Sequence, residues 1–261
     1  MKKALWVLAF CVASVVASSA AHATQSSTDA SDLWWNPNES GWGMQVVQTG
    51  TVIVVTMFVY DEARNPAWYT ATANNPGGLV WSGDLYKTNG PWFGMTPFDP
   101  ATVAPAKVGT LTFAAGPTVI SATVTYTIDG VTVTKDVQRQ TLTFDCFCGE
   151  YVGMIREVLT CDDSARNGTF NAPSAITIYH NSAAPFVMTS TEQGRSCSYS
   201  GTYAQYGRFG QVTDGAYSCT DGTSGAFQFA EMYVNTTGFT GRGTLRSQGC
   251  TATFSFGGIR K

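Results

Sequence analysis

His180 is the single histidine that remains once the N-terminal segment containing His22 is set aside. One histidine excludes zinc sites built from several imidazoles and limits any Ser–His–Asp triad to this position. The sequence Tyr179-His180-Asn181-Ser182 is typical of a strand that runs into a turn, so we predict an exposed side chain. No nucleotide or flavin motif is present in a convincing context, and we expect neither a cofactor nor a metal.

Glu39 is the carboxylate whose neighbours best suit acid catalysis, because Trp35 and Trp42 lie on either side of it. An apolar setting raises a carboxyl pKa and keeps the acid protonated, as glycoside hydrolysis requires of its proton donor. The competing interpretation is that Glu39 hydrogen-bonds a neighbouring backbone group within the turn 36–41. No second carboxylate can be paired with it, so a hydrolase that uses Glu39 is an alternative hypothesis and we assign no catalytic residue.

Aromatic side chains favour a binding surface in the first half of the chain. Trp34 and Trp35 are adjacent, and neighbours in an extended strand point to opposite sides, so both cannot face one core. Trp92 and Phe93 lie in a Gly- and Pro-rich loop, 89–100. Exposed rings could bind sugars or an apolar partner, whereas core packing is the competing interpretation. We predict that at least two of these four rings are exposed and adjacent. The predicted ligand-binding residues are Trp34, Trp35, Glu39, Trp42, Trp92 and Phe93.

Six cysteines follow the N-terminal segment, and all of them lie in the second half of the chain. An even number in an exported protein predicts three disulfides. A hairpin folded over residues 197–219 places Cys197 opposite Cys219 on one face, at a separation that suits a disulfide. The sequence Cys146-Phe147-Cys148 could instead bind a soft metal or exchange disulfides, but export favours structural disulfides.

The remaining four cysteines allow more than one pairing. Cys146 and Cys148, at positions i and i+2 of a strand, would share a face without closing a good bridge. Excluding that bridge leaves Cys148–Cys161 with Cys146–Cys250, or Cys146–Cys161 with Cys148–Cys250. We favour the first arrangement, because nearer partners meet at a smaller entropic cost.

The N-terminus, residues 1–23, has the pattern of a cleaved signal peptide. Lys2 and Lys3 precede an apolar run of about 14 residues, and Ala21-His22-Ala23 follows as the cleavage pattern. That run is shorter than the roughly 20 residues that span a bilayer. We therefore expect a periplasmic or extracellular protein that begins at Thr24, with no membrane span. Without the two lysines the net charge falls from −3 to −5, which argues against nucleic-acid partners.

The elements that must position these residues are β-strands, because short runs alternate apolar and polar positions between turn signals. The run Val52–Tyr60 is apolar on both faces, which predicts a central strand covered on both sides. Asp129-Gly130 between two Thr- and Val-rich runs is typical of a type I′ hairpin turn. After the N-terminal segment, all tryptophans precede residue 144 and all cysteines follow it. This change in composition predicts two antiparallel β-domains, 24–144 and 145–261. The predicted class is all-β, with each domain a barrel, a meander or a sandwich.

The stretch Trp34-Trp35-Asn36-Pro37-Asn38-Glu39-Ser40-Gly41-Trp42-Gly43 resembles the opening of a module found in many secreted bacterial proteins. The other shared segments are Tyr60-Asp61, Pro66-Ala67-Trp68, Ser82-Gly83-Asp84-Leu85-Tyr86, Gly90-Pro91-Trp92-Phe93 and Pro97-Phe98-Asp99-Pro100. The resemblance covers roughly residues 33–142. It implies export and a β-fold, and it does not indicate an activity.

These observations predict an exported, non-enzymatic binding module with a glycan or a cell-envelope component as its partner. Two alternatives stay open, namely the hydrolase that uses Glu39 and an extracellular inhibitor that acts through the disulfide-bonded half. Two carboxylates across a cleft would favour the enzyme. A row of exposed rings would favour the binding module, and a protruding rigid loop would favour the inhibitor.

Overall fold

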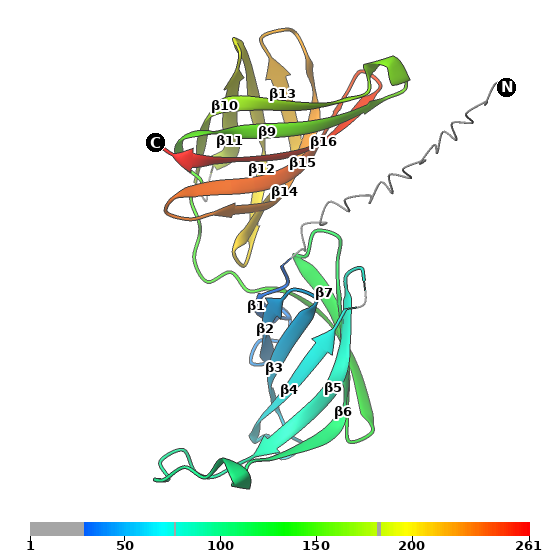
Figure 1. Ribbon diagram of the computed structural model, residues 1–261, viewed down its shortest axis with the longest axis vertical. Helices are drawn as coiled ribbons and strands as arrows, with labels where there is room; N and C mark the ends of the chain where they lie inside the picture. The colour runs from blue at the N-terminus through cyan, green and yellow to red at the C-terminus, as the bar shows by residue number, and fades with distance from the viewer. Residues whose placement is uncertain (1–28, 76, 182–183) are drawn as a thin grey trace, which may run out of the picture.

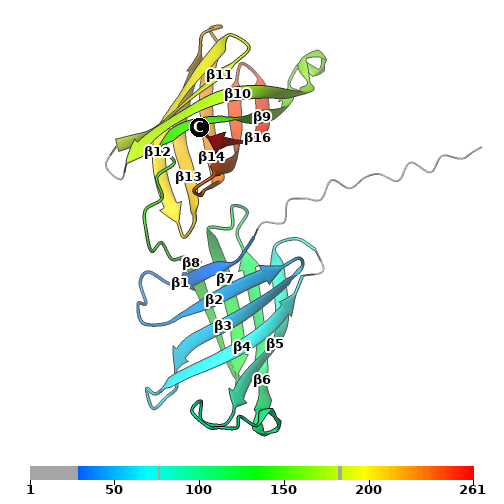
Figure 2. The ribbon, with the colours of Figure 1, turned by 60° about the vertical axis from the view of Figure 1, so that its left-hand side comes forward.

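The chain folds into two closed antiparallel β-barrels of eight strands each, shown from two sides in Figures 1 and 2. The computed structural model describes residues 29–75, 77–181 and 184–261. The predicted all-β class with two antiparallel domains is confirmed, and both domains are barrels in which strands adjacent in sequence pair. The predicted signal peptide, residues 1–23, lies outside the described residues. In the part of the chain that the structure describes, no helix has the length and apolar character needed to cross a membrane.

The first barrel consists of eight strands and one short 3-10 helix. These elements are β1 (Asp32–Trp35), β2 (Gly43–Thr49), β3 (Val52–Tyr60), β4 (Pro66–Asn74), β5 (Val80–Asn89), η1 (Pro100–Thr102), β6 (Ala104–Ala115), β7 (Ser121–Ile128) and β8 (Val131–Arg139). The short strand β1 pairs with both β2 and β8 and so closes the barrel. At the closure, Trp34 lies opposite Arg139.

Strand β3, for which the sequence predicts cover on both sides, buries only one of its two faces. Ile53, Val55 and Met57 are buried in the barrel core, whereas Val54 is 45% and Phe58 is 51% exposed. The prediction that this run is covered on both sides is therefore wrong. In a closed barrel, successive side chains alternate between the interior and solvent, so no second layer covers the outer face.

The β7–β8 hairpin confirms the turn predicted at Asp129-Gly130. Ile128 pairs with Val131 across it. Asp129 has φ of 48° and Gly130 has φ of 86°. A type I′ turn requires positive φ at both central residues, and Asp and Gly adopt that conformation most readily.

The second barrel also has eight strands and one short 3-10 helix. These elements are β9 (Gly149–Cys161), η2 (Ser164–Arg166), β10 (Gly168–Asn181), β11 (Ala184–Glu192), β12 (Arg195–Tyr206), β13 (Phe209–Cys219), β14 (Ser224–Val234), β15 (Gly238–Ser247) and β16 (Cys250–Arg260). The first strand, β9, pairs with the last strand, β16, over eleven positions from Cys161↔Cys250 to Tyr151↔Arg260. This long seam closes the barrel.

Inward-facing phenylalanines fill the middle of the second barrel. Phe229 and Phe256 have ring centroids 4.8 Å apart, and Phe254 lies 5.3 Å from Phe229. The inward position Gly241 makes room for them, since a Cβ there would lie 2.6 Å from the ring of Phe256. Small residues opposite large ones are how a narrow barrel interior reaches native packing density.

The predicted Cys197–Cys219 disulfide is confirmed, and so is the hairpin register behind it. Cys197 pairs directly with Cys219 and Tyr199 with Tyr217 across β12 and β13. The predicted register continues only to Ser200, where it shifts by one residue at a β-bulge. The bulge leaves the disulfide unaffected because it lies beyond Tyr199.

Both pairings considered for the other four cysteines are wrong. The structure contains Cys146–Cys148 and Cys161–Cys250, and neither Cys148–Cys161 with Cys146–Cys250 nor Cys146–Cys161 with Cys148–Cys250. Residues 140–148 form an irregular connector instead of a strand. The bent backbone brings the Cα atoms of Cys146 and Cys148 to 5.2 Å, closer than the roughly 6.6 Å of two steps along a strand.

Polar contacts join the facing ends of the two barrels. Gln205 of β12 donates from Nε2 to the carbonyl oxygen of Thr143 at 2.9 Å and to Asp145 at 3.1 Å, both in the connector. Arg208, in the β12–β13 turn, forms an ion pair with Asp29 at the start of the first barrel. These contacts attach the β12–β13 turn to the first barrel.

Candidate ligand-binding site

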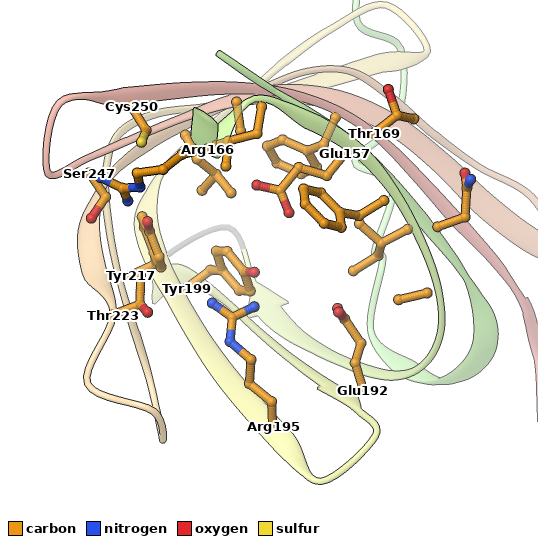
Figure 3. Close-up of a pocket in the computed structure, with 18 of the residues that line it drawn as sticks. Glu157, Arg166, Thr169, Glu192, Arg195, Tyr199, Tyr217, Thr223, Ser247 and Cys250 are labelled. Carbon is orange, nitrogen blue, oxygen red and sulfur yellow. The ribbon is translucent and has the colours of Figure 1, made fainter. Parts of the chain in front are cut away.

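The second barrel is hollowed at one end by a cavity of about 620 Å³, which we call the calyx (Figure 3). Its inner wall includes Ile155, Glu157, Glu192, Tyr199, Tyr217 and Phe254. The connector from the first barrel enters β9 at Gly149, and the calyx opens at the other end of that strand, around Leu159. The open mouth therefore faces away from the end that contacts the first barrel.

The alternation of β9 places a charged side chain inside the barrel. Successive side chains of a strand point to opposite faces, so residues separated by an even number of positions share a face. One face of β9 therefore carries Tyr151, Ile155, Glu157 and Leu159. Ile155 is buried, while Glu157 and Leu159 are half-buried on the same face. Glu157 consequently lies on the calyx wall, between an apolar residue below it and another at the mouth.

Two tyrosines form an aromatic wall of the calyx. Tyr199 and Tyr217 are buried, with ring centroids 5.7 Å apart and nearly parallel planes. Burial raises the pKa of Tyr199 to about 12, so its hydroxyl stays neutral and can both donate and accept hydrogen bonds. In Figure 3 this hydroxyl points into the open space.

Two carboxylates face the same space. Glu157 of β9 and Glu192 of β11 both point into the opening in Figure 3. Burial raises the pKa of each carboxyl group, and the charge of Glu192 adds to the effect on Glu157. The positive charge of Arg195 acts in the opposite direction, but it does not overcome burial. Neither carboxylate forms an ion pair with the described residues.

Two disulfides brace the mouth of the calyx from within the barrel wall. Cys161–Cys250 joins the first and last strands at the end of their seam. Cys197–Cys219 joins β12 to β13. Cys250 itself lines the calyx. Cross-links at these positions restrict how far the joined strands can separate at the rim.

The predicted site residues of the first barrel are divided between its core and its surface. Trp34 is buried, with its Nε1 donating to the carbonyl oxygen of Ala30 at 2.9 Å. Its place on a binding surface is therefore corrected to a place in the core. Trp35 is half-buried, so adjacent tryptophans do point to different sides as predicted. Trp42 is half-buried and packs against the core.

Glu39 does not have the protonated character that acid catalysis requires. Its Oε1 accepts a hydrogen bond from Lys135 Nζ at 2.8 Å, and its Oε2 accepts one from Trp42 Nε1 at 3.0 Å. These contacts, the lysine first, lower the pKa of the Glu39 carboxyl group. The expected raised pKa is wrong because a lysine from β8, distant in sequence, reaches the same end of the barrel.

Trp92 and Phe93 confirm the prediction of exposed, adjacent rings. They are 66% and 92% exposed, and their centroids lie 5.4 Å apart. They belong to the long β5–β6 loop, in which Met95 and Phe98 are also exposed. The loop extends from the end of the first barrel that is remote from the second barrel (Figure 1).

His180 is buried, so the predicted exposure is wrong, although the residue does lie near the end of a strand as predicted. It lies in β10 on the same face as Ile176 and Ile178, and its Nε2 accepts a hydrogen bond from the Phe147 backbone N–H at 2.7 Å. Burial lowers the pKa of the imidazole. Ligand atoms of Cys146, Cys148 and His180 lie within 4.8 Å of one another, but the disulfide ties up both sulfurs, which excludes thiolate ligation in this oxidised form.

The calyx residues were absent from the sequence-based site. One signal for Glu157 is present in the sequence, since Ile155-x-Glu157-x-Leu159 puts a carboxylate on an otherwise apolar strand face. Glu192 and Arg195 gave no comparable signal, because they flank a turn where charged residues are ordinary. Neither a protein-family model nor a curated protein matches the chain, so the chemistry of the site is argued from its own geometry.

Proposed function

We propose that the protein is an exported binding protein whose second barrel holds a small molecule in the calyx. The open cavity of about 620 Å³ is the observation that carries this proposal. Small-molecule sites typically have volumes of about 300–1,000 Å³, mostly apolar walls and a few convergent polar groups. The calyx has this volume and several convergent polar groups, while its wall is about equally polar and apolar. Its disulfide-braced rim favours a preformed site.

The wall composition supports an amphiphilic ligand. Ile155, Leu159, Leu245 and Phe254 supply apolar surface, which favours burial of a hydrocarbon or ring at roughly 25 cal/mol per Å². The carboxylates and the tyrosine hydroxyls would orient the ligand through charge and hydrogen bonds.

Glu157 and Glu192 face one cavity from different strands, the arrangement that favours the enzyme alternative, so a hydrolase would use this pair and not Glu39. We propose binding without catalysis, and glycoside hydrolysis by the protein that is lost in Glu157→Gln would overturn this.

A neutral, polarity-sensitive dye tests this function directly. We expect N-phenyl-1-naphthylamine to bind the exported protein with a stoichiometry of one and to gain fluorescence. Ala252→Trp should abolish the gain, because Ala252 is buried and lines the calyx. Thr253→Trp, on the exposed face of the same strand, is the matched control and should bind normally. Dye binding that survives Ala252→Trp in a folded protein would exclude the calyx as the site.

A second binding surface on the first barrel is favoured by the exposure of Trp92 and Phe93. We propose that this loop contacts a glycan or another cell-envelope component, since flat exposed rings can stack on the apolar faces of sugars. Sedimentation with purified peptidoglycan tests it. The double variant Trp92→Ala/Phe93→Ala should lose co-sedimentation, whereas Val131→Ala, an exposed apolar change in a different hairpin, should retain it. Equal co-sedimentation of both variants would refute this surface.

A further inference from the structure

We propose that the calyx selects an organic ammonium ion, a ligand with a positively charged nitrogen and an apolar or aromatic body. This inference rests on the proposed function and adds the chemical class of the ligand. Glu157, Glu192 and the rings of Tyr199 and Tyr217 carry it.

Within the described part of the chain, neither carboxylate forms an ion pair inside the calyx, although Arg195 also lines the cavity and its positive charge acts on both. Glu157 lies opposite Phe170 and Phe254 in its two neighbouring strands, so apolar positions flank it. Glu192 pairs across β11 and β12 with Arg195, yet the two side chains form no ion pair. A buried negative charge without a partner is unfavourable. A ligand that places a positive charge between Glu157 and Glu192 would compensate their negative charges.

The arginines around the mouth do not supply this charge. Arg195 lines the calyx, and its guanidinium points toward the opening beside Tyr199 (Figure 3), but its Nε donates to Asp221 at 2.7 Å, so its charge is shared with an aspartate outside the calyx lining. Arg166 lies at the rim, where it is exposed. An anionic ligand would therefore meet two inward carboxylates and only one arginine without an acidic partner, which makes anion binding the less favourable alternative.

The tyrosine wall suits the same ligand class. The faces of aromatic rings attract cations, most strongly where water is excluded. Tyr199 and Tyr217 are both less than 10% exposed, at 6% and 7%. Their rings can contact the carbon substituents of an ammonium ion while a carboxylate pairs with its charge. Two carboxylates beside two rings form a site for an organic cation better than for a bare metal ion, which prefers a shell of oxygen ligands.

The matched test compares three probes that share one ring and differ in charge. These are 2-phenylethylammonium, neutral 2-phenylethanol and anionic phenylacetate, titrated into the mature exported protein by calorimetry near neutral pH. We expect the ammonium probe to bind about tenfold more tightly than the alcohol, the difference of roughly one charge-assisted contact. Phenylacetate should bind most weakly.

Carboxamide variants localise the selectivity. Glu157→Gln and Glu192→Gln should each reduce the preference for the ammonium probe over the alcohol by about fivefold or more, as expected from removing one charge partner. The affinity for 2-phenylethanol should change little. Glu150→Gln, on the outer face of β9, is the control and should leave the preference unchanged.

Acid should weaken binding of the ammonium probe but not of the alcohol. The charged or titratable groups that line or flank the calyx are Glu157, Glu192, Arg166, Arg195, Tyr199, Tyr217 and Asp221. The raised pKa values of the two glutamates make them the first carboxyl groups here to protonate as pH falls. Asp221 protonates later, because hydrogen bonds from Thr223 lower its pKa.

The outcomes separate this inference from the proposed function. If the neutral dye binds and Ala252→Trp abolishes that binding, the calyx is a ligand site. Equal or tighter binding of phenylacetate or 2-phenylethanol by such a protein would overturn the ammonium class alone, as would undetectable binding of the ammonium probe. Failure of the dye together with all three probes would overturn the calyx function as well.

Discussion

Arg139 of the first barrel lies with its guanidinium carbon 4.6 Å from the ring centroid of Phe209 in the second barrel. The same guanidinium lies 4.8 Å from the ring of Trp34. Arg139 is fully buried, so one cation is held between an aromatic ring of each barrel. Interactions of this kind strengthen when water is excluded, which makes Arg139 the central residue of the joint.

Arg139→Leu is expected to destabilise the protein by about 3–5 kcal/mol, the range for breaking a buried charge pair. Arg139 donates to Ser31 O and to Asp32 Oδ2, each at 2.9 Å, and to Val119 O at 2.6 Å. Leucine would remove all three of these hydrogen bonds. Denaturant unfolding monitored by tryptophan fluorescence measures the loss.

The control is Arg208→Ala. Its ion pair with Asp29 has side chains that are 35% and 44% exposed, and pairs with such exposure contribute about 1 kcal/mol or less. A larger loss from Arg208→Ala than from Arg139→Leu would contradict the central role of Arg139.

The pairing of strands that are adjacent in sequence follows from local patterns, whereas the closure of each sheet through β1–β8 and β9–β16 does not, because a meander or a sandwich fits the same patterns. The Asp129-Gly130 turn and the Cys197–Cys219 register each depend on residues close in the chain, where spacing alone decides which groups meet. The lowered pKa of Glu39 cannot be predicted from local patterns, for the opposite reason. Lys135 lies 96 positions away, and only the closed barrel brings it within hydrogen-bonding distance. The calyx likewise requires the whole barrel, because its wall residues come from separate strands.

Trp34→Ala and Trp92→Ala should differ widely in their effect on stability. Trp34 is buried against Phe113, with centroids 5.0 Å apart, and truncation of a buried tryptophan typically costs about 3–5 kcal/mol. Trp92 is 66% exposed, and its loss should change stability by no more than about 0.5 kcal/mol. Thermal unfolding by circular dichroism measures both. A comparable drop in melting temperature for the two variants would show that the β5–β6 loop packs more tightly than the structure indicates.

His180 should make stability fall in mild acid. Burial lowers its pKa in the folded state below the ordinary value of 6.5, so the unfolded chain takes up a proton first as pH falls. Stability is therefore fully present above pH 6.5 and decreases as pH falls from there through the lowered pKa.

The comparison variant for this effect is His180→Gln. Its amide oxygen can still accept the hydrogen bond from the Phe147 N–H, but it does not titrate. The stability difference between the wild-type protein and this variant, measured by denaturant unfolding from pH 8 to pH 5, isolates the imidazole from the carboxyl groups. A difference that does not change with pH would exclude His180 as the titrating group.

The two rim disulfides should contribute unequally to stability. Cys161–Cys250 spans 89 residues and Cys197–Cys219 spans 22. In the chain-entropy account the longer loop stabilises by about 4–5 kcal/mol and the shorter by about 3 kcal/mol. Cys161→Ser/Cys250→Ser should therefore unfold at a lower denaturant concentration than Cys197→Ser/Cys219→Ser. It should also lose more dye affinity, because it opens the β9–β16 seam at the mouth of the calyx, next to Leu159. The reverse order of stability, with unchanged dye binding in the first variant, would show that hydrogen bonds alone hold the seam and that the rim disulfide does not shape the cavity.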